Sequence, residues 1–166
     1  MGNVRQFAQQ DFAAVLAIQS ACPEAAQWRE EDYTHLARDP AGLLLIAESE
    51  AVVSEASATG PEGRVFGRNG ASILGFAAFC LIADEAELRN LAVAREHRQR
   101  GVGRALLDKA HGRLRRAGVK RVYLEVRASN NPAIRLYASM GYSILSTRNK
   151  YYPDPPEDAY VWSLDL

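Results

Sequence analysis

Two glycines and three arginines fall within seven residues, from Arg98 to Arg104, directly before an amphipathic stretch. At the start of a helix the first backbone N–H groups have no partner inside the helix and carry a partial positive charge. Gly101 and Gly103 have no Cβ atom to keep a bulky anion away, and the flanking arginines, Arg100 included, add positive charge. The stretch therefore predicts a diphosphate site. An ordinary glycine-containing loop before a helix is the alternative explanation.

The spacing excludes two widespread nucleotide-binding motifs. A dinucleotide-binding fingerprint needs a third small residue at position 106, which here is Leu106. A P-loop needs Gly-Lys-Ser/Thr, which the sequence does not contain. The histidines and cysteines stand too far apart to suggest a metal site, a Ser-His-Asp triad or a disulfide framework. We expect the histidines at the surface or on helix faces, and one cysteine as a small core residue: His35, His97, His111 and Cys80, respectively.

A carboxylate and a phenol further along the chain could move protons. Tyr123, Glu125 and Arg127 share one face of an alternating stretch, as expected for a strand. A carboxylate there could deprotonate an α-amine, whose reference pKa of about 7.7–8 lies well below the value of about 10.4 for lysine. Tyr137, on a predicted helix, could give a proton to a leaving thiolate. Periodicity alone also allows Glu125 to be an exposed partner of Arg127, and Tyr137 to be a core aromatic residue.

Strands and helices alternate along the chain in an order that argues for a mixed α/β (α+β) sheet with helices on its faces. Hydrophobic periodicity, caps and turn residues set the expected bounds. Between residues 49 and 69 the sequence is rich in glycine and poor in large apolar residues, and we expect a long loop there. The expected strands are 4–7, 43–48, 73–83, 85–93, 121–126, 142–145 and 160–166, and the expected helices are 11–21, 28–38, 103–118 and 131–140.

Composition is that of an ordinary globular protein: of 166 residues, 48% are hydrophobic and 24% charged. We expect one domain over residues 1–166. No apolar run approaches the roughly 20 residues that span a bilayer, and no signal peptide is recognisable, so we expect a cytoplasmic protein. The segment from Arg95 to Arg121 contains ten Lys and Arg residues and only two acidic residues. That segment could be a solvated helix face, or it could bind a polyanionic small molecule, an acidic membrane surface or nucleic acid.

Several blocks together resemble the GNAT superfamily of N-acetyltransferases, and within it the bacterial ribosomal-protein-alanine N-acetyltransferases. The resemblance covers roughly the second half of the chain and implies a central, mostly antiparallel sheet that is splayed at its middle, with helices on both faces. The blocks are RQRGVG at 98–103, LEVRASN at 124–130, AIRLY at 133–137, MGY at 140–142, RNKYY at 148–152 and EDAY at 157–160.

The resemblance also implies a role for each matching residue. Glu125 becomes the proton acceptor and Tyr137 the proton donor. Asn130 would hydrogen-bond the pantetheine region, and Asn90 stands where the resembling enzymes also have asparagine. Backbone groups of Leu91, Ala92 and Val93 would pair with the pantetheine arm, and their N–H groups could stabilise an oxyanion where a bulge or strand divergence opens the sheet. The diphosphate would be held by Arg98, Gln99, Arg100, Gly101, Val102, Gly103 and Arg104.

The activity implied is direct transfer of an acetyl group from acetyl-CoA to a protein N-terminal amine in a ternary complex. The acceptor would be the N-terminal alanine of a ribosomal protein; no metal is needed, and neither a membrane nor nucleic acid is an expected partner. Two alternatives stay open. The acceptor could be a lysine side chain or a small-molecule amine, or the chain could be a coenzyme A-binding regulatory module without turnover.

Overall fold

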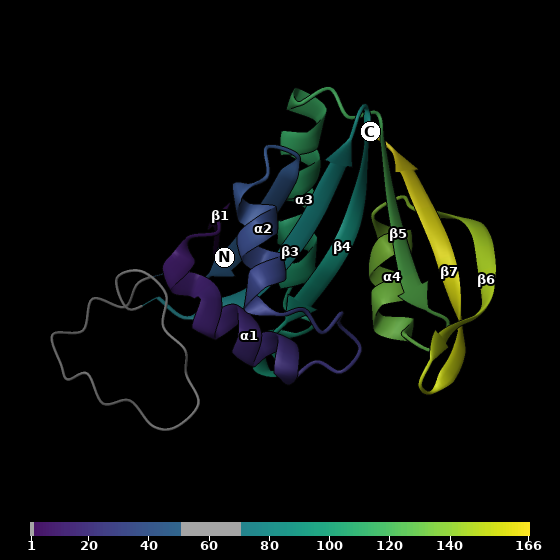
Figure 1. The fold of residues 1–166 in the computed structure, drawn as a ribbon, viewed down its shortest axis with the longest axis horizontal. Helices are drawn as coiled ribbons and strands as arrows, with labels where there is room; N and C mark the ends of the chain where they lie inside the picture. The colour runs from purple at the N-terminus through teal and green to yellow at the C-terminus, as the bar shows by residue number, and fades with distance from the viewer. Residues whose placement is uncertain (1, 51–70) are drawn as a thin grey trace, which may run out of the picture.

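The computed structural model describes residues 2–50 and 71–166 (Figure 1). The long loop expected over 49–69 lies outside this part of the chain, apart from Ser49 and Glu50. The described residues form seven strands and four α-helices. In chain order these are β1 (Asn3–Gln6), α1 (Phe12–Ser20), α2 (Glu30–Arg38), β2 (Gly42–Glu48), β3 (Ile73–Ile82), β4 (Glu85–Val93), α3 (Val102–Arg116), β5 (Arg121–Arg127), α4 (Asn131–Ser139), β6 (Ser143–Pro153) and β7 (Pro156–Asp165).

All seven strands belong to one sheet in the order β1-β2-β3-β4-β5-β7-β6. Every neighbouring pair is antiparallel except β4 and β5, which run parallel. Figure 1 shows α1 and α2 in front of the sheet, with α3 and α4 behind it. This arrangement confirms the expected mixed sheet, mostly antiparallel, with helices on both faces.

β3 is apolar along its whole length, and both of its faces are buried from Ile73 to Phe79. Phe76 and Ala78 belong to the core cluster under α1 and α2, whereas Ala77 and Phe79 belong to the cluster under α3 and α4. Alternate side chains of a strand point to opposite faces, so a strand covered on both sides reads as a continuous apolar run. That pattern predicted the strand, and the structure confirms it.

The sheet opens between β4 and β5. Their pairing covers four residue pairs and ends at Leu88 and Leu124. The register with β3 also shifts there, because Ala78 pairs with Asn90 and the next residue pairs with Leu88, which leaves Arg89 as one extra residue in β4. An extra residue bends a strand and redirects its side chains. The two strands accordingly meet at one end and separate toward the other, which confirms the expected splay (Figure 1).

β6 and β7 are longer than the sequence predicted. β6 continues to Pro153, eight residues beyond the expected end, and β7 begins at Pro156 instead of residue 160. Nearly all of β6 is exposed, since β6 is an edge strand that pairs only with β7. Its residues therefore lack the apolar alternation by which a half-buried strand is recognised.

His111 lies on a face of α3, one of the two placements expected for it, and that face is buried. Its side chain lies on the buried stripe of α3 beside Leu107, Ala110 and Leu114. Its Nε2 atom lies 2.8 Å from the hydroxyl oxygen of Tyr142, so the imidazole has a polar partner inside the core. Burial, with a smaller contribution from the charge of Arg115, lowers the pKa of His111 to about 4. The ring is therefore neutral near pH 7.

Candidate functional site

The glycine-containing turn has the geometry of an anion site. Gly101 caps α3 with φ +81°, a left-handed conformation that favours glycine, and Gln99 also has a positive φ of 58°. The first hydrogen bond of the helix runs from Ala105 N–H to the Gly101 carbonyl oxygen, at 2.9 Å. The preceding N–H groups at the start of α3 are thus free to face outward. A Cβ atom on Gly101 would meet nothing within 4 Å, so the space beside the turn is open.

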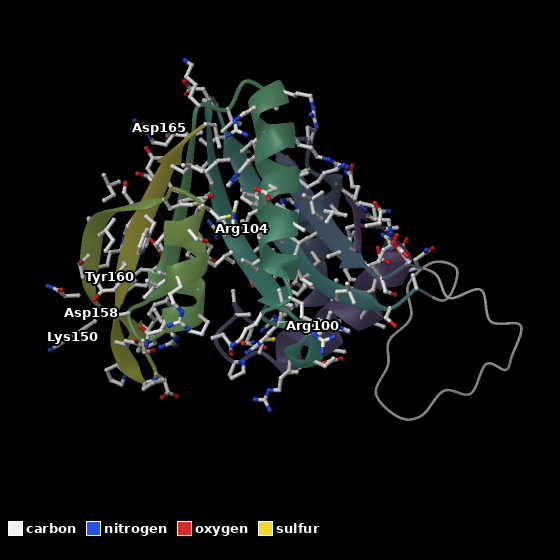
Figure 2. The ribbon with its side chains drawn as sticks, turned by 180° about the vertical axis from the view of Figure 1, so that it is seen from behind. Arg100, Arg104, Lys150, Asp158, Tyr160 and Asp165 are labelled. Carbon is white, nitrogen blue, oxygen red and sulfur yellow. The ribbon has the colours of Figure 1, made fainter. Side chains whose placement is uncertain are left out.

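The turn borders a groove of about 430 Å³, here called the turn groove. It brings together every residue predicted to bind the cofactor except Arg100. Figure 2 shows Arg100 at the N-terminal end of α3 and Arg104 on the side of that helix toward α4. The groove is lined by Cys22, Glu24, Leu91, Ala92, Val93, His97, Arg98, Gln99, Gly101, Val102, Gly103, Arg104, Asn130, Pro132, Ala133 and Leu136.

Arg98 lines the turn groove, but its guanidinium group already has protein partners. Nη2 lies 2.6 Å from a carboxylate oxygen of Glu24 and 2.9 Å from the sulfur of Cys22, and Nε donates to the Val93 carbonyl oxygen at 3.1 Å. Arg98 therefore links the segment between α1 and α2 to the end of β4 through these contacts. Burial raises the pKa of the Cys22 thiol, although Arg98 opposes the change, so a neutral thiol is favoured.

Arg104 and Asn130 are held at the groove by α4. Arg104 donates to the Ser139 hydroxyl oxygen at 2.7 Å, which keeps its positive charge beside the turn. Asn130 caps α4, with its Oδ1 accepting from the Ala133 N–H at 3.3 Å. That bond orients the side chain and leaves its amide nitrogen available as a donor.

A second hollow, of about 680 Å³, contains Glu125 and Tyr137 and is here called the Glu125 cleft. Its walls come from the segment between α1 and α2, the splayed parts of β4 and β5, the start of α4 and the end of β6. The cleft and the turn groove share four lining residues: Glu24, Leu91, Asn130 and Ala133. The two hollows therefore meet at the opening between β4 and β5.

Glu125 follows the last residue of β5 that pairs with β4. Its carboxylate lies 3.1 Å from Nε of Arg148 on β6, and a hydrogen bond to this carboxylate is the main reason that the pKa of Tyr151 is raised. The alternative partner offered by periodicity, Arg127, is engaged elsewhere. It lies 3.3 Å from Glu157 and stacks its guanidinium 4.0 Å from the ring centre of Tyr152.

Tyr137 is both a core residue and a lining residue of the Glu125 cleft. Its side chain is buried, and its ring centre lies 5.8 Å from that of Tyr142. Burial, followed by the charge of Tyr152, raises the pKa of Tyr137 above its ordinary value. The phenol therefore keeps its proton at neutral pH, as a proton donor must.

Three features near Glu125 were not among the residues predicted for the site. Arg148 lies on the part of β6 that was not expected to be a strand. Asn90 had a readable signal, because it is a polar residue at a buried position of an alternating strand. The segment from Pro23 to Gln27 stands where the resembling enzymes have Phe-Pro-Trp, and contacts with Arg98 and Asn90 set its position over β4.

The sequence matches the acetyltransferase (GNAT) family over residues 12–142. The chain belongs to this family. A GNAT relative, the [ribosomal protein bS18]-alanine N-acetyltransferase of Escherichia coli K12, is 43% identical over 93 residues, which are 55% of this chain and 63% of the relative. The match thus spans less than two thirds of that enzyme's length.

Solved GNAT structures have the same fold. The ribosomal-protein-S18-alanine N-acetyltransferase from Escherichia coli superposes with a TM-score of 0.76 and 28% identity, covering 100% of this chain and 94% of that one. Arabidopsis thaliana NAA60, in a complex with a bisubstrate analogue, gives a TM-score of 0.79 at 18% identity, with 99% and 98% coverage. At that identity the second likeness concerns the fold alone.

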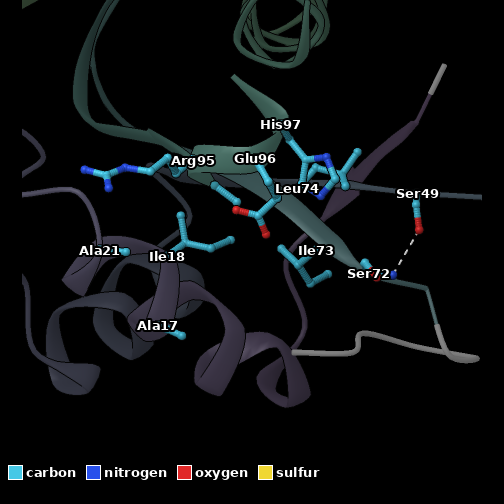
Figure 3. A pocket seen from close by; sticks show the side chains of 11 residues that line it. Ala17, Ile18, Ala21, Ser49, Ser72, Ile73, Leu74, Arg95, Glu96 and His97 are labelled. Carbon is cyan, nitrogen blue, oxygen red and sulfur yellow. Dashed lines mark hydrogen bonds between the residues drawn. The ribbon is translucent and has the colours of Figure 1, made fainter. Parts of the chain in front are cut away.

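A third pocket of this GNAT protein, of about 340 Å³, lies between α1 and the beginning of β3 (Figure 3). Its lining includes Ile18, Ser49, Ser72 and Glu96, and it contains none of the predicted site residues. In residues 2–50 and 71–166, no group of three metal-binding side chains could hold an ion. None of the helices in the described chain is long and apolar enough to cross a membrane.

Proposed function

We propose that this GNAT protein is an acetyl-CoA-dependent N-acetyltransferase that acts on protein N-terminal amines by direct transfer in a ternary complex. The observation that carries the proposal is the meeting of two hollows at the split between β4 and β5. One has a glycine turn suited to a diphosphate, and the other contains Glu125 and Tyr137. A thioester in the first hollow and an amine in the second could therefore meet at this split.

The turn groove fits the cofactor by its donors and its shape. The outward N–H groups at the start of α3 would hold the diphosphate, and Arg104 would add a positive charge. β4 has no strand partner on its β5 side beyond Leu88, so backbone groups of Leu91 and the N–H of Val93 on that side could bind the pantetheine amides. Acetyl-CoA supplies the activated acetyl group when bound. Asn130 would donate its amide N–H to the pantetheine arm.

Residues of the Glu125 cleft would accept and donate the protons that move during the transfer. The amine nitrogen forms the new bond to the acetyl carbon while the carbon–sulfur bond breaks. Glu125 would take the proton that the amine loses, and Tyr137 would give its own proton to the departing thiolate. Free N–H groups of β4 near Leu91 would stabilise the oxyanion, which resembles the role of backbone amides in other acyl transfers.

The N-terminal alanine of a ribosomal protein is the acceptor that we favour. The supporting observation is the similarity to enzymes named for that acceptor, at 43% identity over part of the chain and at 28% identity in a solved structure. A weakly basic α-amine also suits a single carboxylate base better than lysine does. Action in the cytoplasm belongs to the same proposal.

The test is an acceptor screen with purified protein and labelled acetyl-CoA. Three acceptors are compared. The first is a peptide that begins with alanine, the second is a peptide with a blocked N-terminus and an internal lysine, and the third is a small polyamine. Mass spectrometry locates the acetyl group. Exclusive labelling of the α-amine is expected. Labelling of only lysine or the polyamine would show that the proposed acceptor is wrong. Cofactor binding without any product would indicate a regulatory module.

A further inference from the structure

Asn90 is buried with an exposed fraction of 4%, yet its Oδ1 atom has no hydrogen-bond partner. Among the described residues, only one other buried side-chain atom, Nε1 of Trp162, is in the same position. Leaving a buried acceptor unpaired is energetically unfavourable. An unpaired oxygen in a side chain that lines a cleft suggests that a ligand provides the missing donor.

The orientation of the Asn90 amide is fixed by a chain of hydrogen bonds that begins at Trp28. The Trp28 backbone N–H donates to Oε1 of Gln19 at 3.0 Å, and Nε2 of Gln19 donates to the Trp28 carbonyl oxygen at 2.8 Å. The Gln19 amide therefore cannot be reversed. Its Oε1 also accepts the hydroxyl proton of Tyr33.

Because the Tyr33 proton is used on Gln19, the Tyr33 oxygen can only accept from Asn90. Nδ2 of Asn90 lies 3.0 Å from that oxygen and 2.9 Å from the carbonyl oxygen of Ala26. Both amide hydrogens are thus engaged. A reversed Asn90 amide would place Oδ1 against these two acceptors, which no hydrogen bond could satisfy. Oδ1 is consequently held in place as an acceptor.

The bulge at Arg89 determines the face of the sheet on which the Asn90 side chain lies. Leu88 belongs to the core cluster under α3 and α4, whereas Ala92 belongs to the cluster under α1 and α2. The extra residue therefore changes the face on which alternate side chains of β4 lie. Asn90 is thereby placed in the lining of the Glu125 cleft, together with Glu125 and Tyr137.

We propose that Oδ1 of Asn90 accepts a hydrogen bond from the acceptor amine and so makes the enzyme selective for primary amines. This inference rests on the proposed function. A neutral primary amine has two hydrogens and one lone pair. When the lone pair attacks, one N–H faces the base Glu125, and the second is left for Asn90. A secondary amine has only one hydrogen and cannot satisfy both groups.

The experiment compares two peptides that differ in one methyl group. One begins with alanine and the other with N-methylalanine, and kcat/KM is measured for each with saturating acetyl-CoA. The wild-type protein should favour the primary amine by at least about tenfold. Asn90→Leu, a substitution of similar shape, should lower kcat/KM for alanine by about tenfold and that for N-methylalanine much less, since one neutral hydrogen bond is lost.

Tyr33→Phe is the matched control. It disturbs the same network and keeps the ring in the core, while the Ala26 carbonyl still orients the Asn90 amide. This variant should retain the wild-type preference. Equal losses for both peptides in Asn90→Leu would show a structural role only and would overturn the inference.

Two further outcomes keep the test decisive. If the Asn90→Leu protein does not fold, Asn90→Ser is measured in its place. It should also reduce the preference for the alanine peptide over the N-methylalanine peptide. If the wild-type protein acetylates both peptides within twofold, the inference fails without any variant. If it acetylates neither the alanine peptide nor any other amine, the proposed function itself fails.

Discussion

Nε of Arg148 lies 3.1 Å from the carboxylate of Glu125, although β7 separates their two strands in the sheet. The pair joins the outer strands to the residue that we propose as the base. Glu125 is therefore a partly screened carboxylate with a cation and the Tyr151 hydroxyl beside it. An incoming ammonium ion would compete with Arg148, whereas a neutral amine would not.

Glu125→Gln should abolish most of the turnover without weakening the binding of acetyl-CoA. Loss of a general base typically costs a factor of about 10²–10⁴ in rate. The remaining rate should depend on the amine that is neutral in solution and should rise roughly tenfold per pH unit below a pKa of about 8. Steady-state kinetics from pH 6 to 9 and calorimetric titration of the cofactor check both points. An unchanged rate would remove Glu125 from the mechanism.

Arg148→Gln should have a small effect. The Arg148 side chain is 54% exposed, and an exposed ion pair contributes at most about 1 kcal/mol. Because about 1.4 kcal/mol corresponds to tenfold in rate, kcat should fall by less than tenfold, and the deficit should shrink at high salt. Arg121→Gln removes a comparable exposed pair, with Asp165 at the other end of β5, and should leave kcat unchanged. A loss as large as that of Glu125→Gln would mean that Arg148 itself contacts the substrate.

Local patterns predicted the elements of the fold and the glycine turn, whereas the resemblance to the family supplied the other residues expected at the groove. The buried run of β3, the stripe of α3 and the glycines of the turn are readable one element at a time. The surroundings of Glu125 cannot be read from single elements in this way. Arg148 reaches it from an exposed edge strand without apolar alternation, and Asn90 depends on a bulge that only pairing with β3 reveals. The partners of Arg98 come from residues 22 and 24, which no spacing rule connects to position 98.

Arg104 and Arg98 should differ in their effect on the cofactor. Arg104→Ala should weaken acetyl-CoA binding by roughly tenfold at low salt, as expected for loss of a charged hydrogen bond, and should make the affinity less sensitive to salt. Arg98→Ala should mainly lower the melting temperature, because its guanidinium holds Glu24, Cys22 and Val93 together. Calorimetric titration at two salt concentrations and thermal unfolding separate the two roles. A lower salt sensitivity in Arg98→Ala would show that Arg98 also reaches the phosphates.

Gly103→Val should close the turn groove. A Cβ atom at this position would lie 3.0 Å from Cδ2 of Leu136, so a branched side chain must fill the space between α3 and α4. We expect acetyl-CoA affinity to fall by more than tenfold while the circular dichroism spectrum stays the same. Gly112→Ala on the same helix is the control. Its Cβ would meet only Arg116 Nη1, at 3.9 Å, and should stabilise the helix by about 0.5–1 kcal/mol with unchanged affinity. Retained binding in Gly103→Val would place the cofactor elsewhere.

Stability should fall below pH 6.5 because His111 is buried as a neutral ring. Its pKa is about 4 in the folded protein against an ordinary value of 6.5, with burial the main cause, Arg115 adding to it and Asp108 opposing it. Above pH 6.5 the ring is neutral in both states, and the full stability is present. Between pH 6.5 and 4 the unfolded chain binds a proton that the folded chain does not, so the free energy of unfolding should drop by roughly 2–3 kcal/mol.

His111→Gln isolates this effect from the carboxylates that titrate in the same range. The amide can still reach the Tyr142 hydroxyl, and it has no proton to gain. Urea unfolding of both proteins at pH 7.5 and pH 4.5 gives the comparison. The wild-type protein should lose more stability than the variant between the two pH values, by roughly 2–3 kcal/mol. Equal losses would mean that the ring becomes protonated without unfolding, with the core opening to admit water beside Tyr142.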